Sequence, residues 1–355
     1  MKTTPPTATV RPTTTISRAA ATPSSAVAGP AIVVENLEKT YSNGTQAVRG
    51  ISFQVKQGEI FGILGPNGAG KSTAIGILGT LVVPTGGRAL VNGIDVTKNR
   101  NSIRKMIGFA MQDAGVDDLA TGREFLMLQG RLYGVPKAII RKRTDQLLQL
   151  FELTDAADKR IKAYSGGMKR RIDLASALIH FPKVLFLDEP TEGLDPRSRI
   201  TMWNTLKRLR QQLGTTILLS THYMEEADRL CDRIAIIDQG KIVVIGTSGE
   251  LKASVGGQSV VLEYSPLDAA KVINAEEAVN RARLATRTQR SGNTLNCYVT
   301  NGAEAAPRIL RALDGAQAPP ASLRIQQPTL DDVYLKYTGR KIEDAEAKSS
   351  DGGKQ

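Results

Sequence analysis

Short apolar runs and segments with helical periodicity alternate along the chain. Residues 59–64, 184–187 and 216–219 form nearly continuous apolar runs of strand length, which are typical of strands buried in a parallel sheet. From residue 119 to about residue 162, apolar residues recur near i, i+3 and i+4, as in amphipathic helices. The pattern therefore predicts an α/β fold with a helical insertion. Further strands are predicted at 31–34, 47–55, 88–91 and 107–111, a hairpin at 233–238 and 241–245, and helices that start at 73 or span 123–133, 136–151 and 172–178.

The same patterning divides the chain into four parts. Residues 1–30 are rich in Thr, Pro and Ala and contain no acidic residue, so we predict a disordered tail. A main domain is predicted at 31–250, with its helical subdomain at about 113–165. A small α+β domain is expected at 251–340, and a second disordered tail at 341–355. The α+β domain is expected to contain strands at 259–263, 294–299 and 322–325 and helices at 267–284 and 303–313.

A glycine-rich stretch stands where the strand at 59–64 gives way to a helix. It fits the pattern G-x-x-x-x-G-K-[ST], in which backbone N–H groups face a phosphate chain. In that pattern the side chain of Lys71 reaches the β- and γ-phosphates, and the hydroxyl of Ser72 ligates Mg²⁺. A chance glycine-rich turn is the alternative, but the flanking strand and helix favour the phosphate site. The predicted nucleotide-binding residues are Gly65, Pro66, Asn67, Gly68, Ala69, Gly70, Lys71, Ser72 and Thr73.

A second glycine-containing turn precedes the predicted helix at 172–178. It consists of Ser165, Gly166 and Gly167. A serine at a helix start is often only a cap. The same group of backbone N–H donors is also able to hold an anion. The residues alone leave both interpretations open.

Two carboxylates follow the apolar run at 184–187. Ligands of open α/β sheets collect at the carboxyl ends of the strands, so Asp188 is placed to hold Mg²⁺ and Glu189 to polarise an attacking water. His222 follows the run at 216–219 in a similar way. A single histidine is more often structural, but a strand end beside a phosphate site favours a functional role.

Composition narrows the class of protein. The chain has 355 residues, of which 41% are hydrophobic and 23% charged, as in an ordinary globular protein. No apolar run approaches the roughly 18 residues of a membrane span. Cys231 and Cys297 have no metal or redox spacing, which suits a reducing compartment. The net charge of +12 is dispersed among acidic residues, which favours an anionic membrane surface or no specific partner over nucleic acid.

The motifs occur in the order found in ATP-binding cassette (ABC) ATPases, and residues 31–250 resemble that family. The resemblance implies an α/β P-loop NTPase of the ABC type, with a mixed core sheet, an antiparallel β subdomain and a helical subdomain, followed by the small α+β domain. ATP and Mg²⁺ are the implied cofactors. Tyr41 would stack on adenine and His222 would contact the γ-phosphate. Gln112 would touch both Mg²⁺ and the helical subdomain. The implied catalytic residues are Glu189, His222 and Gln112, and the implied metal ligands are Ser72, Gln112 and Asp188.

The resemblance also implies a dimer with two nucleotides held between the subunits. The signature turn, consisting of Ser165, Gly166, Gly167 and Met168, would close over ATP bound to the other subunit, and Asp195 would communicate across the same interface. Two positions depart from the family pattern. Met168 replaces the usual glutamine, and Glu192 precedes the Gly-Leu-Asp sequence. Neither departure removes a phosphate ligand, so they bear on rate and dimer affinity.

A narrower resemblance rests on residues 164–171 and 329–339, which are similar to the ATPase subunits of daunorubicin-resistance exporters. It implies a peripheral subunit at the cytoplasmic face of the cell membrane. It also implies that two copies of this subunit form a homodimer, which drives efflux of a drug-like or lipid/antibiotic substrate through a separate integral membrane permease. No nucleic acid partner is expected. The segment between Gln112 and Tyr164 would pass the change to the permease.

Three alternatives carry less weight. A cassette ATPase acting on ribosomes or nucleic acid is disfavoured by the single phosphate loop and the absence of sustained heptads. A GTPase is disfavoured because the chain has no Asn-Lys-x-Asp sequence. An importer ATPase with a regulatory C-terminal unit is less consistent with the closing segment at 331–339.

Overall fold

The computed structural model describes residues 29–112 and 115–342. The two predicted tails therefore lie outside the described residues, apart from positions 29, 30, 341 and 342. The chain divides into two compact units that interleave along the sequence. The first unit contains the described residues up to Leu37, together with Ser52–Ile60 and Ile75–Leu219, and the second contains Glu38–Ile51, Phe61–Ala74 and the described residues from Ser220 onward.

Buried neighbouring strands form the centre of the first unit. They lie in the order β8-β7-β6, and β6 (Ile107–Ala110) pairs parallel with β7 (Val184–Asp188). Parallel pairing places the carboxyl ends of both strands at one edge of the sheet. The predicted apolar runs are therefore confirmed as buried strands. The unit also contains α2 (Arg100–Met106), β4 (Gly86–Val91) and β5 (Ile94–Asp95), while β1 (Ile32–Thr40), β2 (Gln46–Val55), α1 (Lys71–Leu78) and β8 (Thr216–Thr221) contain residues of both units.

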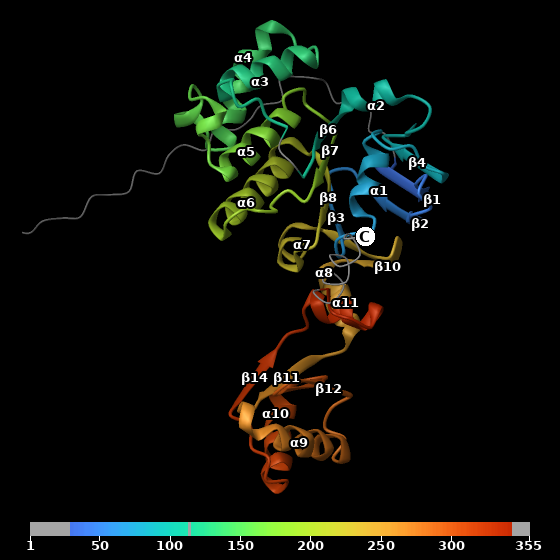
Figure 1. Ribbon diagram of the computed structural model, residues 1–355, viewed down its shortest axis with the longest axis vertical. Coiled ribbons are helices and arrows are strands. Elements are labelled where there is room, and N and C mark those ends of the chain that lie inside the picture. The colour runs from blue at the N-terminus through green and yellow to red at the C-terminus, as the bar shows by residue number, and fades with distance from the viewer. Residues whose placement is uncertain (1–28, 113–114, 343–355) are drawn as a thin grey trace, which may run out of the picture. The chain divides into compact units, whose positions relative to one another are not determined.

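The helical insertion is confirmed in the first unit. It begins with α3 (Gly122–Leu132), whose capping box joins Thr121 and Glu124, and continues with α4 (Lys137–Leu150). These helices contact α5 (Gly166–Ala177), and the three lie together in Figure 1. Residues 113 and 114, at the start of the predicted subdomain, lie outside the described residues. The long helix α6 (Pro196–Leu213) follows β7.

Strand β3 (Ile60–Leu64) carries the phosphate loop in the second unit. From Phe61 to Leu64 it pairs parallel with β9 (Arg233–Asp238). Strand β9 pairs antiparallel with β10 (Lys241–Gly246), which confirms the predicted hairpin. The turn between them has left-handed backbone at both Gln239 (φ 47°) and Gly240 (φ 78°), as two-residue hairpin turns require. Helices α7 (Met224–Leu230) and α8 (Ser248–Val255) flank the hairpin in the sequence.

The C-terminal part of the second unit contains an antiparallel sheet in the order β12-β13-β11-β14. Helices α9 and α10 lie along one side of it in Figure 1, and their apolar faces share a core with β11 and β13. Burial raises the pKa of Cys297, within this core, to about 12. The elements are β11 (Gln258–Glu263), α9 (Ala269–Arg281), β12 (Arg287–Ser291), β13 (Thr294–Val299), α10 (Gly302–Gly315), β14 (Ser322–Gln326) and α11 (Leu330–Thr338).

Two of these elements were not predicted, and one helix is shorter than predicted. Strand β12 has the polar sequence RTQRS, so it carries no alternation of apolar residues to mark it. Helix α11 begins with a capping box between Thr329 and Asp332, a signal that the sequence offered. Helix α9 ends at Arg281, before the left-handed backbone of Arg283 (φ 49°). No helix in the described part of the chain is long and apolar enough to span a bilayer.

Candidate active site

The phosphate loop is held tightly where it leaves β3. The N–H of Gly65 donates to the carbonyl of Thr221 at 3.2 Å, and a Cβ on Gly65 would lie 2.3 Å from the carbonyl oxygen of Ile237. Gly70 has a φ of 102°, and a Cβ there would lie 2.2 Å from the carbonyl oxygen of Ala47. Only glycine fits either position without displacing backbone. Asn67, Gly68 and Ser72 are exposed, so the loop presents its tip and the helix start to solvent.

Lys71 is folded over this loop. Its Nζ donates to the carbonyl oxygens of Gly65 at 2.8 Å and Pro66 at 3.1 Å, and the side chain is buried. These bonds hold the ammonium group among the loop's own backbone, at the beginning of α1. A positive group in that position, together with backbone N–H donors, suits a bound phosphate chain.

Tyr41 and His222 adjoin the phosphate loop within the second unit. The Tyr41 hydroxyl lies 3.2 Å from Oγ1 of Thr73, and the Tyr41 side chain is exposed. His222 directly follows Thr221, whose carbonyl accepts the hydrogen bond from the N–H of Gly65. The structure therefore brings three separately predicted features together in one unit.

The acidic strand end lies in the first unit. Glu189 follows β7 with left-handed backbone (φ 48°), an uncommon conformation for a residue other than glycine, and is only 6% exposed. Asp188, the last residue of β7, is half-buried. The sharp change of direction after Asp188 takes Glu189 out of the strand. Strained backbone of this kind persists only where surrounding contacts enforce it.

Arg170 supplies such contacts. Its guanidinium donates to the carbonyls of Asp188 (2.9 Å), at the end of β7, and of Glu189 (3.2 Å) and Pro190 (3.0 Å), which follow it. It also donates to the carbonyls of Met111 and, at 3.1 Å, Gln112 beyond β6. Arg170 is only 5% exposed. Its position in the sequence did not indicate this role, because Arg170 stands in the basic run 169–171, which resembles a solvated helix face.

Gln112 and Glu192 meet in the first unit. The amide Nε2 of Gln112 donates to Oε2 of Glu192 at 2.6 Å. Glu192 is one of the two departures from the family pattern. Its carboxylate therefore holds the side chain predicted to touch Mg²⁺, a contact that the sequence position of Glu192 alone did not indicate.

The signature turn and Asp195 are used as helix caps. Ser165 Oγ accepts from the N–H of Met168 at 3.3 Å, and Asp195 Oδ1 accepts from the N–H of Ser198 at 3.0 Å. The bonds from Ser198 hold the pKa of Asp195 below its usual range. Ser165 and Gly166 are nevertheless exposed, so the start of α5 is open to solvent. The capping interpretation of the sequence is confirmed, and it does not prevent a second role.

The structure thus places the predicted residues in two groups. The phosphate loop, Tyr41 and His222 lie in the second unit, whereas Gln112, Asp188, Glu189, the signature turn and Asp195 lie in the first.

Two family models match the chain. One, described as ABC transporter, matches residues 48–192, and one described as the C-terminal domain of DrrA1-3-like ATP-binding proteins matches residues 246–338.

Related proteins match along most of the chain. The daunorubicin resistance ATP-binding protein DrrA2 of Streptomyces coeruleorubidus is 42% identical over 91% of this chain and 99% of its own length. This chain belongs to the ATP-binding subunits of ABC transporters. The linearmycin resistance ATP-binding protein LnrL of Bacillus subtilis is 38% identical over 87% of this chain and 99% of its own.

Solved structures agree with this membership. A dimeric ATP-binding cassette in a post-hydrolysis state, bound to ADP and Pi, matches with a TM-score of 0.56 and 29% identity, covering 61% of this chain and 98% of that cassette. The predicted P-loop ATPase fold is therefore confirmed. The chain is a nucleotide-binding ATP hydrolase coupled to transport, of the exporter type, and the ribosome or nucleic acid alternative is not favoured.

The buried carboxylate of Asp173 gives the ATPase a measurable pH dependence of stability. Burial raises its pKa to about 6 from an ordinary value of 3.8, although Arg170 lies 3.5 Å away and opposes the rise. The folded protein then binds this proton more tightly than the unfolded chain does, so the stabilisation present below pH 4 is lost as pH rises towards 6. Between pH 4 and pH 7, we expect the free energy of unfolding to fall by roughly 2.4 kcal/mol more in the unchanged protein than in Asp173→Asn.

Urea unfolding of both proteins at unit steps of pH measures this difference. The variant keeps the other titrating groups, so it is a direct control. Parallel stability profiles in the two proteins would contradict a raised pKa for Asp173.

Proposed function

We propose that the chain binds ATP at its phosphate loop and hydrolyses it as a dimer. The observation that carries this proposal is that the phosphate loop presents an exposed tip in the same unit as Tyr41 and His222. The loop and Lys71 bind the phosphates, Tyr41 stacks on adenine, and His222 contacts the γ-phosphate. Glu189 orients the attacking water and accepts its proton. ATP supplies the phosphoryl group whose transfer to water drives transport.

The residues available suit Mg²⁺ bound through its nucleotide. In the part of the chain that the structure describes, no group of three or more His, Cys, Asp or Glu side chains forms a metal cluster. Mg²⁺ is usually held by one or two carboxylates together with substrate phosphates and water, rather than by a cage of protein ligands. Ser72, an exposed residue beside Lys71, offers a hydroxyl oxygen of this kind within the second unit.

The dimer places the signature turn of one subunit against the ATP of the other. Ser165 and Gly166 are exposed at the start of the twelve-residue helix α5, where N–H groups and the helix dipole favour an anion. The dimeric cassette that this chain resembles was solved with ADP and Pi. Met168 replaces the usual glutamine next to this contact, so we expect the departure to alter dimer affinity more than phosphate binding.

We further propose that the ATPase acts at the cytoplasmic face of the cell membrane on a separate integral membrane subunit. The transported molecule belongs to the class of amphipathic, antibiotic-like compounds. The related proteins named for daunorubicin and linearmycin resistance support this class. The chain would supply the energy, while the membrane subunit would select the compound.

A groove in the first unit is suited to the membrane subunit. It has a volume of about 570 Å³ and lies between β6, the signature helix α5 and α3. Its rim contains the exposed apolar side chains of Leu81 (54%) and Met111 (57%). Met111 precedes Gln112, and its carbonyl accepts from Arg170. An amphipathic helix of the membrane subunit in this groove would therefore touch the segment that carries Gln112.

Placing a charge in this groove should separate hydrolysis from transport. In cells that produce the chain with its membrane subunit, we expect Leu81→Asp to reduce daunorubicin efflux at least tenfold, because an aspartate cannot be buried against an apolar helix without a large cost. The purified variant should retain most of its ATPase activity. Efflux is followed by daunorubicin fluorescence, and ATPase activity by phosphate release.

Leu267→Asp is the matched control, because Leu267 is 95% exposed and lies outside the groove. Equal efflux by Leu81→Asp and Leu267→Asp would exclude the groove as the docking site. If the unchanged purified chain releases no phosphate from Mg-ATP, the proposed ATP site itself fails.

A further inference from the structure

Helix α11, near the C-terminal end of the described chain, packs against the strands that carry the phosphate loop. Leu330, Val333 and Tyr334 share one buried cluster with residues of β3 and β9. This cluster lies entirely within the second unit and is separate from the core of the C-terminal sheet. The residues of α11 that form it are Leu330, Val333 and Tyr334, and those of β3 and β9 are Leu64, Ile234 and Ile236.

Two donors from this region converge on one carboxylate. The hydroxyl of Tyr334 donates to Oδ1 of Asp238 at 3.0 Å. Nη2 of Arg340 reaches both oxygens of the same carboxylate, at 2.8 and 3.1 Å. The side chain of Asp238 is 13% exposed and that of Arg340 is 28% exposed, so the ion pair is partly shielded from solvent. Charge-assisted bonds in such a position are among the stronger hydrogen bonds in proteins.

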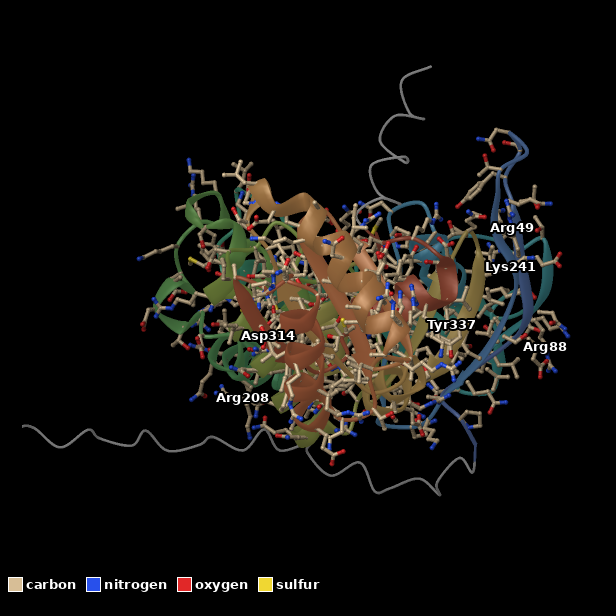
Figure 2. The ribbon with its side chains drawn as sticks, turned by 90° about the horizontal axis from the view of Figure 1, so that it is seen from below. Arg49, Arg88, Arg208, Lys241, Asp314 and Tyr337 are labelled. Carbon is tan, nitrogen blue, oxygen red and sulfur yellow. The ribbon has the colours of Figure 1, made fainter. Side chains whose placement is uncertain are left out.

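Asp238 is the last residue of β9, and the turn that follows it holds the phosphate loop. The N–H of Gly240 donates to the carbonyl of Ala69 at 3.0 Å, and the carbonyl of Gly240 accepts from the N–H of Arg49 at 2.8 Å. Figure 2 labels Arg49, a residue of β2, and Lys241, the first residue of β10. The backbone of Ile237 also blocks any side chain at Gly65. Residues 237–240 therefore contact the phosphate loop both where it begins and near where it ends.

We propose that Asp238, Tyr334 and Arg340 form a latch through which helix α11 positions the phosphate loop for ATP. The inference rests on the proposed ATP site. The three side chains do not touch the nucleotide. They fix the strand end and turn whose backbone the loop packs upon, so the loop's N–H groups are held in place before ATP arrives. Affinity gained by preorganisation of this kind is lost when the supporting contacts are removed.

The coupling is reciprocal. If the latch raises affinity for ATP, then bound ATP strengthens the latch by the same factor. The amide hydrogens of helix α11 should therefore exchange more slowly when ATP binds, although the helix belongs to the C-terminal segment. Burial, together with the charge of Asp238, raises the pKa of Tyr334 to about 12, so the hydroxyl is a proton donor at neutral pH.

Removal of one hydroxyl tests the latch. We expect Tyr334→Phe to weaken ATP binding about tenfold, within the range of ordinary allosteric coupling. Calorimetry with ATP and EDTA measures the dissociation constant without hydrolysis. In the nucleotide-free variant, amide hydrogens of residues 65–70 should exchange faster than in the unchanged protein. A general loss of stability would instead speed exchange in other parts of the protein as well.

Tyr337→Phe is the matched control, because Tyr337 lies on the same helix and its hydroxyl donates to Ser254 Oγ, at 3.4 Å, instead of to Asp238. Arg340→Gln provides a second test at a more exposed position and should weaken ATP binding at least threefold. The latch would be overturned if Tyr334→Phe and Arg340→Gln bound ATP as tightly as Tyr337→Phe does. Failure of the unchanged protein to bind ATP would instead overturn the proposed ATP site.

Discussion

Glu189→Gln should reduce steady-state ATP hydrolysis by about 10²- to 10⁴-fold, the usual contribution of a positioned general base. The amide keeps the size and shape of the side chain but cannot accept the proton of the attacking water. Glu189 is buried, and its left-handed backbone is fixed by the surrounding carbonyl contacts, so the substitution should leave the fold intact. Phosphate release from Mg-ATP measures the loss.

The same variant should accumulate as an ATP-dependent dimer. In the proposed dimer, each nucleotide would be held by the phosphate loop of one subunit and the signature turn of the other, so dissociation would wait for hydrolysis. Size-exclusion chromatography with and without Mg-ATP shows the change, and Glu189→Gln combined with Lys71→Ala is the control that should remain monomeric. Normal hydrolysis by Glu189→Gln would remove Glu189 from its role as the base. A monomer that binds ATP would instead contradict the dimer.

The sequence predicted the elements whose patterns are strong. The runs at 184–187 and 216–219 are buried strands, and the Gln239-Gly240 hairpin is present, because buried strands and tight turns are specified by local residue choice. Strand β12 was missed because its position depends on pairing with β13 and not on its own polar sequence. Pairing between distant segments leaves no local signal of this kind.

The candidate site likewise combines residues that a local pattern predicts with residues whose roles depend on distant contacts. The phosphate loop was recognised because its spacing and context are specific. Arg170 and Glu192 were not assigned roles at the site, because their importance arises from contacts 18 to 80 residues away. An arginine in a basic run on a helix usually faces solvent. Only the packing of α5 against the ends of β6 and β7 turns Arg170 inward.

Arg170→Lys should lower kcat for ATP hydrolysis by about 10- to 100-fold while KM changes by less than about threefold, since misplacement of a catalytic group costs rate more than binding. The planar fork of Arg170 donates at once to a carbonyl that follows β6 and to carbonyls at and just after the end of β7. A lysine presents one compact ammonium group and cannot span both strand ends. Glu189 should then lose its enforced position, whereas Lys71 and its bonds to the phosphate loop are unchanged, so we expect ATP binding to persist.

Arg171→Lys is the matched control on the same helix, because Arg171 bonds to the carbonyls of Gly167 and Phe151 and to none at the strand ends. The decisive comparison is the double variant. If Arg170 acts by positioning Glu189, then Arg170→Lys should add little to the loss already caused by Glu189→Gln, because the two residues work as one unit. Losses that multiply in full would mean that Arg170 contributes to hydrolysis independently of Glu189.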